Sequence, residues 1–247
     1  MDILPLPRFG LVVPPENPVA EPEFNRFIGS ELNVYTTRFP VTPVFDHATM
    51  ELYNEVLPDV LATFGKLALG AAVVACNASH YLFGPDGDAE FLAGLSQRFG
   101  YPVQSTSHAI VDLLEVLGQK RLTLVSPYAP WLTDISRGYW EKAGLTVDHI
   151  AYAPAEAGVD GAEDRFNPYE VTTATLLERV RAAGVPGDGV LLFTGTGMAT
   201  VTAAEHLARE GDARTLVTSN LASAWWARRT LGLTGAAHPL VERLNAR

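Results

Sequence analysis

The chain has 247 residues, of which 47% are hydrophobic and 19% charged, and it carries one cysteine. This composition is that of a globular protein with one large or two small domains. Its 28 acidic and 18 basic residues give a formal charge of −10, which disfavours non-specific binding to nucleic acid or an anionic membrane. One cysteine forms neither an internal disulfide nor, by itself, a zinc finger or an iron–sulfur cluster.

The first residues, Met1-Asp2-Ile3-Leu4-Pro5, contain no basic segment followed by an apolar run. We therefore expect no secretory signal and a cytoplasmic location. The six histidines are not spaced as metal ligands, so we predict no metal site.

Apolar runs of strand length alternate with amphipathic runs of helix length along the chain, which is typical of parallel sheets covered by helices on both faces. The predicted strands are Phe9–Val13, Leu32–Thr36, Ala71–Ala75, Val103–Gln104, Leu122–Val125, Thr146–Ile150, Val190–Phe193 and Thr215–Val217. The predicted helices include Ala109–Leu117, Trp131–Ala143, Glu170–Ala183, Thr200–Arg209 and Ala222–Leu231. Between Ala153 and Pro168 the chain is rich in alanine, glycine and acidic residues, and we predict a loop over the substrate site.

The order of motifs in the first part of the chain recurs in the second. The recurring segments are 9–14, 72–77 and 105–107, then 122–127, 190–195 and 218–220. We therefore predict an α/β fold of two pseudo-symmetric flavodoxin-like halves. Each half is a four-stranded parallel sheet flanked by helices, and the active site lies in the cleft between them. The first half takes residues 1–108 and 220–247 and carries Cys76, whereas the second takes 109–219 and carries Tyr128 and Thr194.

Small polar residues follow the predicted strands where helices begin. They are Asn17, Asn77, Ser79, Ser105 to Ser107, Thr194, Thr196, Ser219 and Asn220. Helix N-termini leave backbone N–H groups free and carry partial positive charge, which suits a carboxylate or a phosphate. Each residue taken singly is better explained as a helix N-cap. Their recurrence at equivalent places in both halves favours an anion-binding cleft.

Cys76 closes the predicted strand Ala71–Ala75 and precedes a helix start, so we expect its thiol at the mouth of the cleft with a lowered pKa. Such a thiolate would act as a base or a nucleophile; the alternative is an inert buried cysteine. Tyr128 follows the matching strand of the second half and could donate to a carboxylate or an enolate, or be a half-buried aromatic residue. His80, four residues after Cys76, is a candidate auxiliary acid or a cap histidine.

These segments resemble the Asp/Glu racemase superfamily, and within it the branch of maleate cis-trans isomerases and arylmalonate decarboxylases. The resemblance is carried by residues 10–17, 75–79, 125–128 and 219–220 before Trp225. It implies a two-domain α/β homodimer that uses no cofactor or metal. It also implies an active site between the halves, with one cysteine from each half on opposite faces of the substrate.

The resemblance assigns roles to particular residues. In the maleate isomerases, the residues that match Asn17 and Tyr128 hold substrate carboxylates, and Cys76 matches the nucleophile. The second cysteine is missing, because the chain has Thr194 at its place, or Gly195 if the alignment slips by one. Arylmalonate decarboxylases keep only the second-half cysteine, so this chain is their mirror image.

One thiol disfavours two-base racemisation but leaves two reactions open. A Cys76 thiolate could add to the double bond of a maleate-like dicarboxylate and leave after rotation, which is the preferred hypothesis. Alternatively, the Cys76 thiol could protonate the enediolate formed when a substituted malonate loses CO₂. A third hypothesis is a non-catalytic protein that binds a small carboxylate. In each case Thr194, Gly195 and the polar strand-end residues would surround a small anionic carboxylate.

Overall fold

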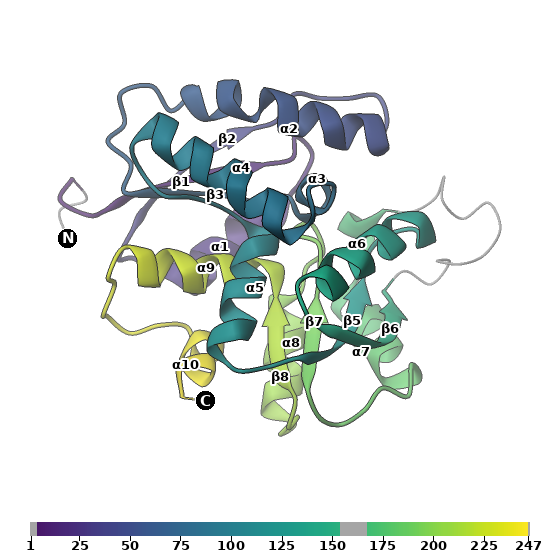
Figure 1. The fold of residues 1–247 in the computed structure, drawn as a ribbon. Helices are drawn as coiled ribbons and strands as arrows, with labels where there is room; N and C mark the ends of the chain where they lie inside the picture. The colour runs from purple at the N-terminus through teal and green to yellow at the C-terminus, as the bar shows by residue number, and fades with distance from the viewer. Residues whose placement is uncertain (1–3, 154–166, 247) are drawn as a thin grey trace.

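The computed structural model describes residues 4–153 and 167–246, which contain two four-stranded parallel sheets (Figure 1). The first sheet has the order β2-β1-β3-β4, with β1 at Arg8–Val13, β2 at Asn33–Arg38, β3 at Ala71–Val74 and β4 at Val103–Ser105. The second has the order β6-β5-β7-β8, with β5 at Arg121–Ser126, β6 at Thr146–Tyr152, β7 at Val190–Phe193 and β8 at Thr215–Thr218. The identical strand order confirms the predicted fold of two similar halves.

Helices connect successive strands and cover both sheets. They are α1 (Ala20–Ile28), α2 (His47–Ala62), α3 (Asn77–Tyr81), α4 (Gly84–Phe99), α5 (Thr106–Val116), α6 (Pro130–Lys142), α7 (Thr173–Ala182), α8 (Val201–Arg209), α9 (Ser219–Thr230) and α10 (Pro239–Asn245). Both α5 and α9 start three residues earlier than predicted, because the Ser105 and Thr218 hydroxyls accept hydrogen bonds from N–H groups of the first turns. The predicted loop over the site falls mostly on residues 154–166, outside the described residues.

One apolar core is shared by the two halves. Phe9 and Val73 of the first sheet and Leu124 and Leu192 of the second belong to the same buried cluster. Helices α5 and α9 pack against each other, and α9 also packs on α1 and β3 of the first half (Figure 1). Two further cores lie under α2 and α4 on the first sheet and under α7 and α8 on the second. These contacts place α9 on the first half, whereas α10 contacts α8 of the second half as well as α9.

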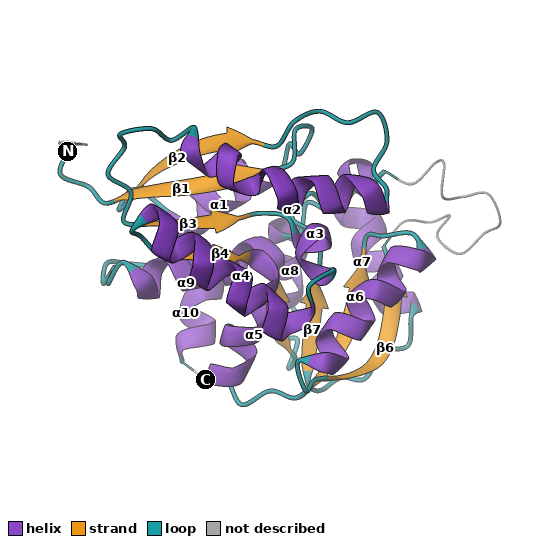
Figure 2. Cartoon of the chain, turned by 45° about the horizontal axis from the view of Figure 1, so that its top comes forward, coloured by secondary structure: helices purple, strands orange, loops and turns teal. Residues whose placement is uncertain are grey.

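The carboxyl ends of the first sheet's strands face the second half. In Figure 2 the arrows of β1 and β3 point toward α3, and α3 contacts both α2 of the first half and α6 of the second. No helix among the described residues is long and apolar enough to cross a membrane. The strand ends that carry the predicted site residues therefore meet where the two halves join.

Candidate active site

The loops that follow β3 and β7 are bonded to each other. The Thr196 hydroxyl donates to the Ala75 carbonyl at 2.7 Å, and the Gly195 N–H donates to Asn77 Oδ1 at 3.2 Å. These bonds join the residues on either side of Cys76 to the loop of residues 194–198, which we call the β7 loop. Cys76 and the β7 loop therefore lie at one junction between the halves.

Strand register identifies the position equivalent to Cys76 in the second half. The Ala75 N–H donates to the Val12 carbonyl, and the Thr194 N–H donates to the Val125 carbonyl. Val12 and Val125 hold the same place in β1 and β5, since β3 and β7 pair with them as Val74 with Val12 and Phe193 with Val125. Thr194 is thus equivalent to Ala75. Of the two predicted counterparts of Cys76, the register selects Gly195.

Gly195 is held in a conformation and a space that exclude a side chain. Its φ is +81°, and an added Cβ would lie 2.5 Å from Pro127 Cγ and 3.3 Å from the Tyr128 hydroxyl. We therefore expect Gly195→Ala to cost about 1–3 kcal/mol of stability and to lower kcat/KM by displacing Tyr128. Enzyme assays and thermal unfolding would measure both effects.

Gly211→Ala is the matched control for this substitution. Gly211 has a φ of +80°, but an added Cβ would have nothing within 4 Å. Gly211→Ala should lose stability through backbone strain alone and keep the kcat/KM of the wild-type protein. An unchanged kcat/KM in Gly195→Ala would contradict the placement of Tyr128 in the site.

The Cys76 thiol is buried, with 4% of the residue exposed. Burial raises the pKa of the Cys76 thiol, because desolvation outweighs the opposing effect of the Ser79 hydroxyl and the N–H groups of Ser79 and Ala78. The predicted lowering of this pKa is therefore wrong. The helix that Cys76 precedes has five residues, and no cation among the described residues contributes to the shift. The thiol of this structure is neutral at pH 7.

Four tyrosines lie near enough to Cys76 for a thiolate there to raise their pKa values. They are Tyr53 of α2, Tyr81 of α3, Tyr128 after β5 and Tyr169 of the 3-10 helix Pro168–Glu170. Burial is the largest cause that raises their pKa values, to about 12 for Tyr53 and Tyr169. All four hydroxyls therefore remain protonated donors at neutral pH.

Two buried hydroxyls beside Cys76 lack hydrogen-bond partners of normal geometry, those of Ser79 and Tyr81. Tyr81 contacts Tyr128 edge to face, with ring centroids 6.3 Å apart. Buried hydroxyls whose hydrogen bonds are incomplete often mark the place of a water or a ligand. Their presence supports a polar ligand at this site.

No motif in the sequence points to Tyr53, Tyr81 or Tyr169. Tyr81 follows Cys76 by five residues, and this proximity was the one available signal. Tyr53 and Tyr169 come from distant segments. The Tyr169 ring lies on the backbone of Gly197, since a Cβ there would be 2.3 Å from Tyr169 Cε1.

The Asn17 side chain forms hydrogen bonds within its own loop and to the second half. Its Oδ1 accepts from the Val19 and Ala20 N–H groups at 2.9 and 3.0 Å, and its Nδ2 donates to the Thr196 hydroxyl at 3.0 Å. Arg38 fixes the same loop by donating to the carbonyls of residues 14, 15 and 17. Asn17 and Thr196 are thus brought together, as expected for one site. The Asn17 side-chain amide has two N–H groups, and the bond to the Thr196 hydroxyl uses one of them.

Asn77 links three segments. Its Oδ1 accepts from the Gly195 N–H and from the Ser219 hydroxyl, and its Nδ2 donates to the Ser107 hydroxyl at 3.1 Å. Asn220 donates to the Thr196 carbonyl at 3.1 Å. Asn77, Ser219 and Asn220 therefore hold the β7 loop in place in this structure.

The two remaining predicted residues, Thr194 and His80, each bond within their own half. The Thr194 hydroxyl is fully buried and donates to the Val125 carbonyl at 3.4 Å. His80 is fully buried, and its Nδ1 lies 2.7 Å from Asp88 Oδ1. Asp88 also accepts from the Ser105 and Tyr139 hydroxyls. His80 thus belongs to a buried polar cluster that joins α3, α4 and α6.

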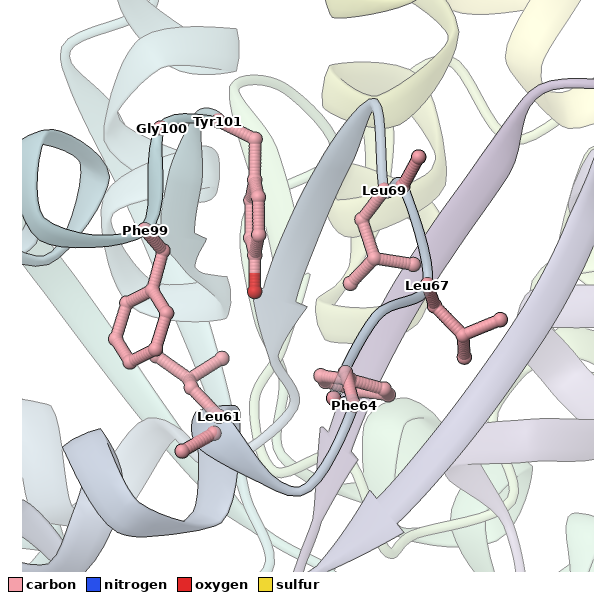
Figure 3. A pocket seen from close by; sticks show the side chains of 10 residues that line it. Leu61, Phe64, Leu67, Leu69, Phe99, Gly100 and Tyr101 are labelled. Atoms are coloured by element: carbon pink, nitrogen blue, oxygen red, sulfur yellow. The ribbon is translucent and has the colours of Figure 1, made fainter.

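A surface pocket of about 480 Å³ lies at the opposite end of the first sheet (Figure 3). Leu69 and Tyr101 line it, and they precede β3 and β4, whereas Cys76 follows β3. Its other labelled side chains, Leu61, Phe64, Leu67 and Phe99, are apolar. This pocket therefore does not belong to the Cys76 site.

Comparison with known proteins identifies relatives over nearly the whole chain. The family model described as arylmalonate decarboxylase matches residues 9–242. The arylmalonate decarboxylase of Bordetella bronchiseptica is 26% identical over an alignment that covers 96% of each chain.

Similar solved structures include maleate isomerases and decarboxylases. A Nocardia farcinica maleate cis-trans isomerase variant with a covalently bound succinylcysteine intermediate has a TM-score of 0.77 at 20% identity, covering 96% of this chain and 99% of its own. The maleate isomerase from Pseudomonas putida S16 has a TM-score of 0.82 at 14% identity, covering 96% of each chain. Unliganded arylmalonate decarboxylase has a TM-score of 0.75 at 20% identity, covering 96% of this chain and 99% of its own. At these identities the structures establish the fold.

Proposed function

Because the chain belongs to the arylmalonate decarboxylase family, we propose that it is a cofactor-free decarboxylase of substituted malonates with the Cys76 thiol as proton donor. The observation that carries the proposal is the buried, neutral Cys76 beside neutral hydroxyl donors. A proton donor must be protonated in the resting enzyme, and burial keeps Cys76 in that form.

The reaction begins when a carbon–carbon bond of the bound malonate breaks and CO₂ leaves. The bonding electrons stay on the remaining carbon and carboxylate as an enediolate, and the Tyr128 and Tyr81 hydroxyls stabilise its oxygens by hydrogen bonding. Cys76 then transfers its proton to the α-carbon, which gives a monocarboxylate and a thiolate. A proton from water restores the thiol, because a buried thiolate is strongly basic.

A single proton donor predicts a single product enantiomer. Decarboxylation in D₂O should place one deuterium on the α-carbon, from the face on which Cys76 lies. If the family's second-half cysteine protonates the other face, the product handedness here is opposite to that of those decarboxylases. NMR and chiral chromatography of an arylmalonate reaction would check both points. A racemic product would contradict the proposed single donor.

Isomerisation of a maleate-like dicarboxylate is the second candidate. Asn17 and Tyr128 occur where the resemblance expects carboxylate-binding residues, and the similar Nocardia farcinica variant contains a covalently bound succinylcysteine intermediate. A cysteine adduct of that kind requires thiolate addition. The raised pKa of Cys76 makes the thiolate scarce and places this reaction second. Incubation with maleate, followed by NMR of fumarate, distinguishes the two reactions.

A further inference from the structure

Glu23 is a buried carboxylate that the proposed mechanism does not use. It lies on α1 of the first half with 4% of the residue exposed, and it reaches the start of α8 in the second half. Its Oε1 accepts from the Thr200 N–H at 2.5 Å and the Val201 N–H at 2.7 Å, and its Oε2 accepts from the Thr200 hydroxyl at 3.0 Å. Glu23 therefore supplies the N-terminal cap of α8, for which Thr200 makes no side-chain cap of its own.

The same carboxylate is connected to the Cys76 site through one amide. Asn220 Nδ2 donates to Glu23 Oε2 at 2.9 Å and to the Thr196 carbonyl at 3.1 Å. Thr196 in turn donates to the carbonyl of Ala75, the residue before Cys76. Glu23 thus fixes which way the Asn220 amide points, and that amide holds the backbone of the β7 loop.

We propose that Glu23 is a positioning residue that locks the β7 loop against the Cys76 segment through Asn220. The inference rests on the proposed function in one respect, since it takes the Cys76 site to be catalytic. Asn220 Nδ2 donates both to Glu23 and to the Thr196 carbonyl, so the side chain at position 23 must offer acceptor oxygens only, as a carboxylate does. If the Asn220 amide were reversed, its Oδ1 would face the Thr196 carbonyl oxygen, and no hydrogen bond would form between them.

Glu23→Gln separates this role from the capping of α8. In the variant, Oε1 can still accept from Thr200 and Val201, and Nε2 can donate to the Thr200 hydroxyl. However, Nε2 and Asn220 Nδ2 would then be two donors facing each other. If the Asn220 amide flips to relieve this contact, its oxygen faces the Thr196 carbonyl. In either arrangement one of the two hydrogen bonds of Asn220, to residue 23 or to the Thr196 carbonyl, is lost, while the cap of α8 remains.

Amide hydrogen exchange of the wild-type protein and variants tests the proposal without an activity assay. In Glu23→Gln we expect exchange at Thr194 and Gly195, whose N–H groups donate to the Val125 carbonyl and to Asn77 Oδ1, to be about tenfold faster by NMR, since a buried hydrogen bond that holds the β7 loop is lost. Asn220→Ala removes the same connection without changing Glu23, and it should show the same local effect. Unchanged exchange at these residues in both folded variants would overturn the proposal.

Glu205→Gln is the matched control, because Glu205 of α8 pairs with Arg26 of α1 at 3.2 Å and with His238 at 3.0 Å, and so joins the same two helices without contacting Asn220. It should leave exchange in the β7 loop and kcat/KM unchanged. With a malonate substrate, Glu23→Gln should lower kcat about tenfold and change KM less, because the chemical step needs the aligned loop. If the wild-type protein turns over neither malonates nor maleate, the proposed function fails, whereas the exchange result still decides the role of Glu23.

Discussion

Replacing Cys76 with alanine is expected to lower kcat for malonate decarboxylation about a thousandfold, in line with the contribution of a positioned general acid. Cys76 is the one cysteine of the chain, and its second-half counterpart, Gly195, offers no side chain. The enediolate would then depend on water for its proton in a buried site. CO₂ release and product formation under saturating substrate would measure the loss.

Cys76→Ser is the closest comparison in size. A serine hydroxyl is a far weaker acid than a thiol, so this variant should be nearly as slow as alanine. Circular dichroism and thermal unfolding of both variants would exclude misfolding as the cause. If Cys76→Ala kept turnover within about threefold of the wild-type rate, the proton would come from another group.

The pH dependence of kcat/KM is expected to separate the two proposed reactions. Burial raises the pKa of Cys76, so the protonated form persists to a higher pH than in an exposed thiol. Decarboxylation, which uses the thiol, should therefore stay level from about pH 6 through the ordinary thiol range and fall only above it. Isomerisation, which uses the thiolate, should instead rise with pH over the same range. Initial rates with an arylmalonate and with maleate between about pH 6 and about pH 10 would show which profile holds.

Stability has to be followed in the same experiment. The folded protein keeps the Cys76 proton at pH values where the unfolded chain has lost it, so folding binds a proton there. The contribution of Cys76 to stability is therefore full below the ordinary thiol pKa and is lost as the pH rises through the folded value. Cys76→Ser removes this linkage and provides the control for unfolding. An alkaline fall in activity that precedes any loss of circular dichroism reports titration of the site. A decarboxylation rate that rises across this range would contradict the thiol as proton donor.

Local sequence patterns predicted the fold well because the two sheets are built from short-range signals. The strand Val190–Phe193 has the predicted bounds, and the equal order of both sheets follows from the recurring motifs. The polar residues at the strand ends were also identified, because parallel strands bring their carboxyl ends to one edge. Asn17, Asn77 and Thr196 indeed form one bonded network.

The parts of the site that come from distant segments had no such signal. Tyr53 lies in α2 and Tyr169 in the short 3-10 helix Pro168–Glu170, and neither is near Cys76 in the sequence. The role of Glu23 depends on a contact with Thr200, which lies 177 residues away. A pattern read along the chain cannot contain these contacts, because packing between the halves creates them.

The two-halved α/β fold, the single thiol at a strand end and the loss of its partner all follow from patterns along the chain. The protonation of that thiol and the identity of its second-half counterpart depend instead on packing and strand register. Cys76 lies in the buried cluster of the first sheet with Val12, Tyr53 and Val74, and this desolvation outweighs the local N–H groups that suggested a thiolate. The pKa of a group depends on everything packed around it, whereas a sequence motif specifies only its neighbours along the chain.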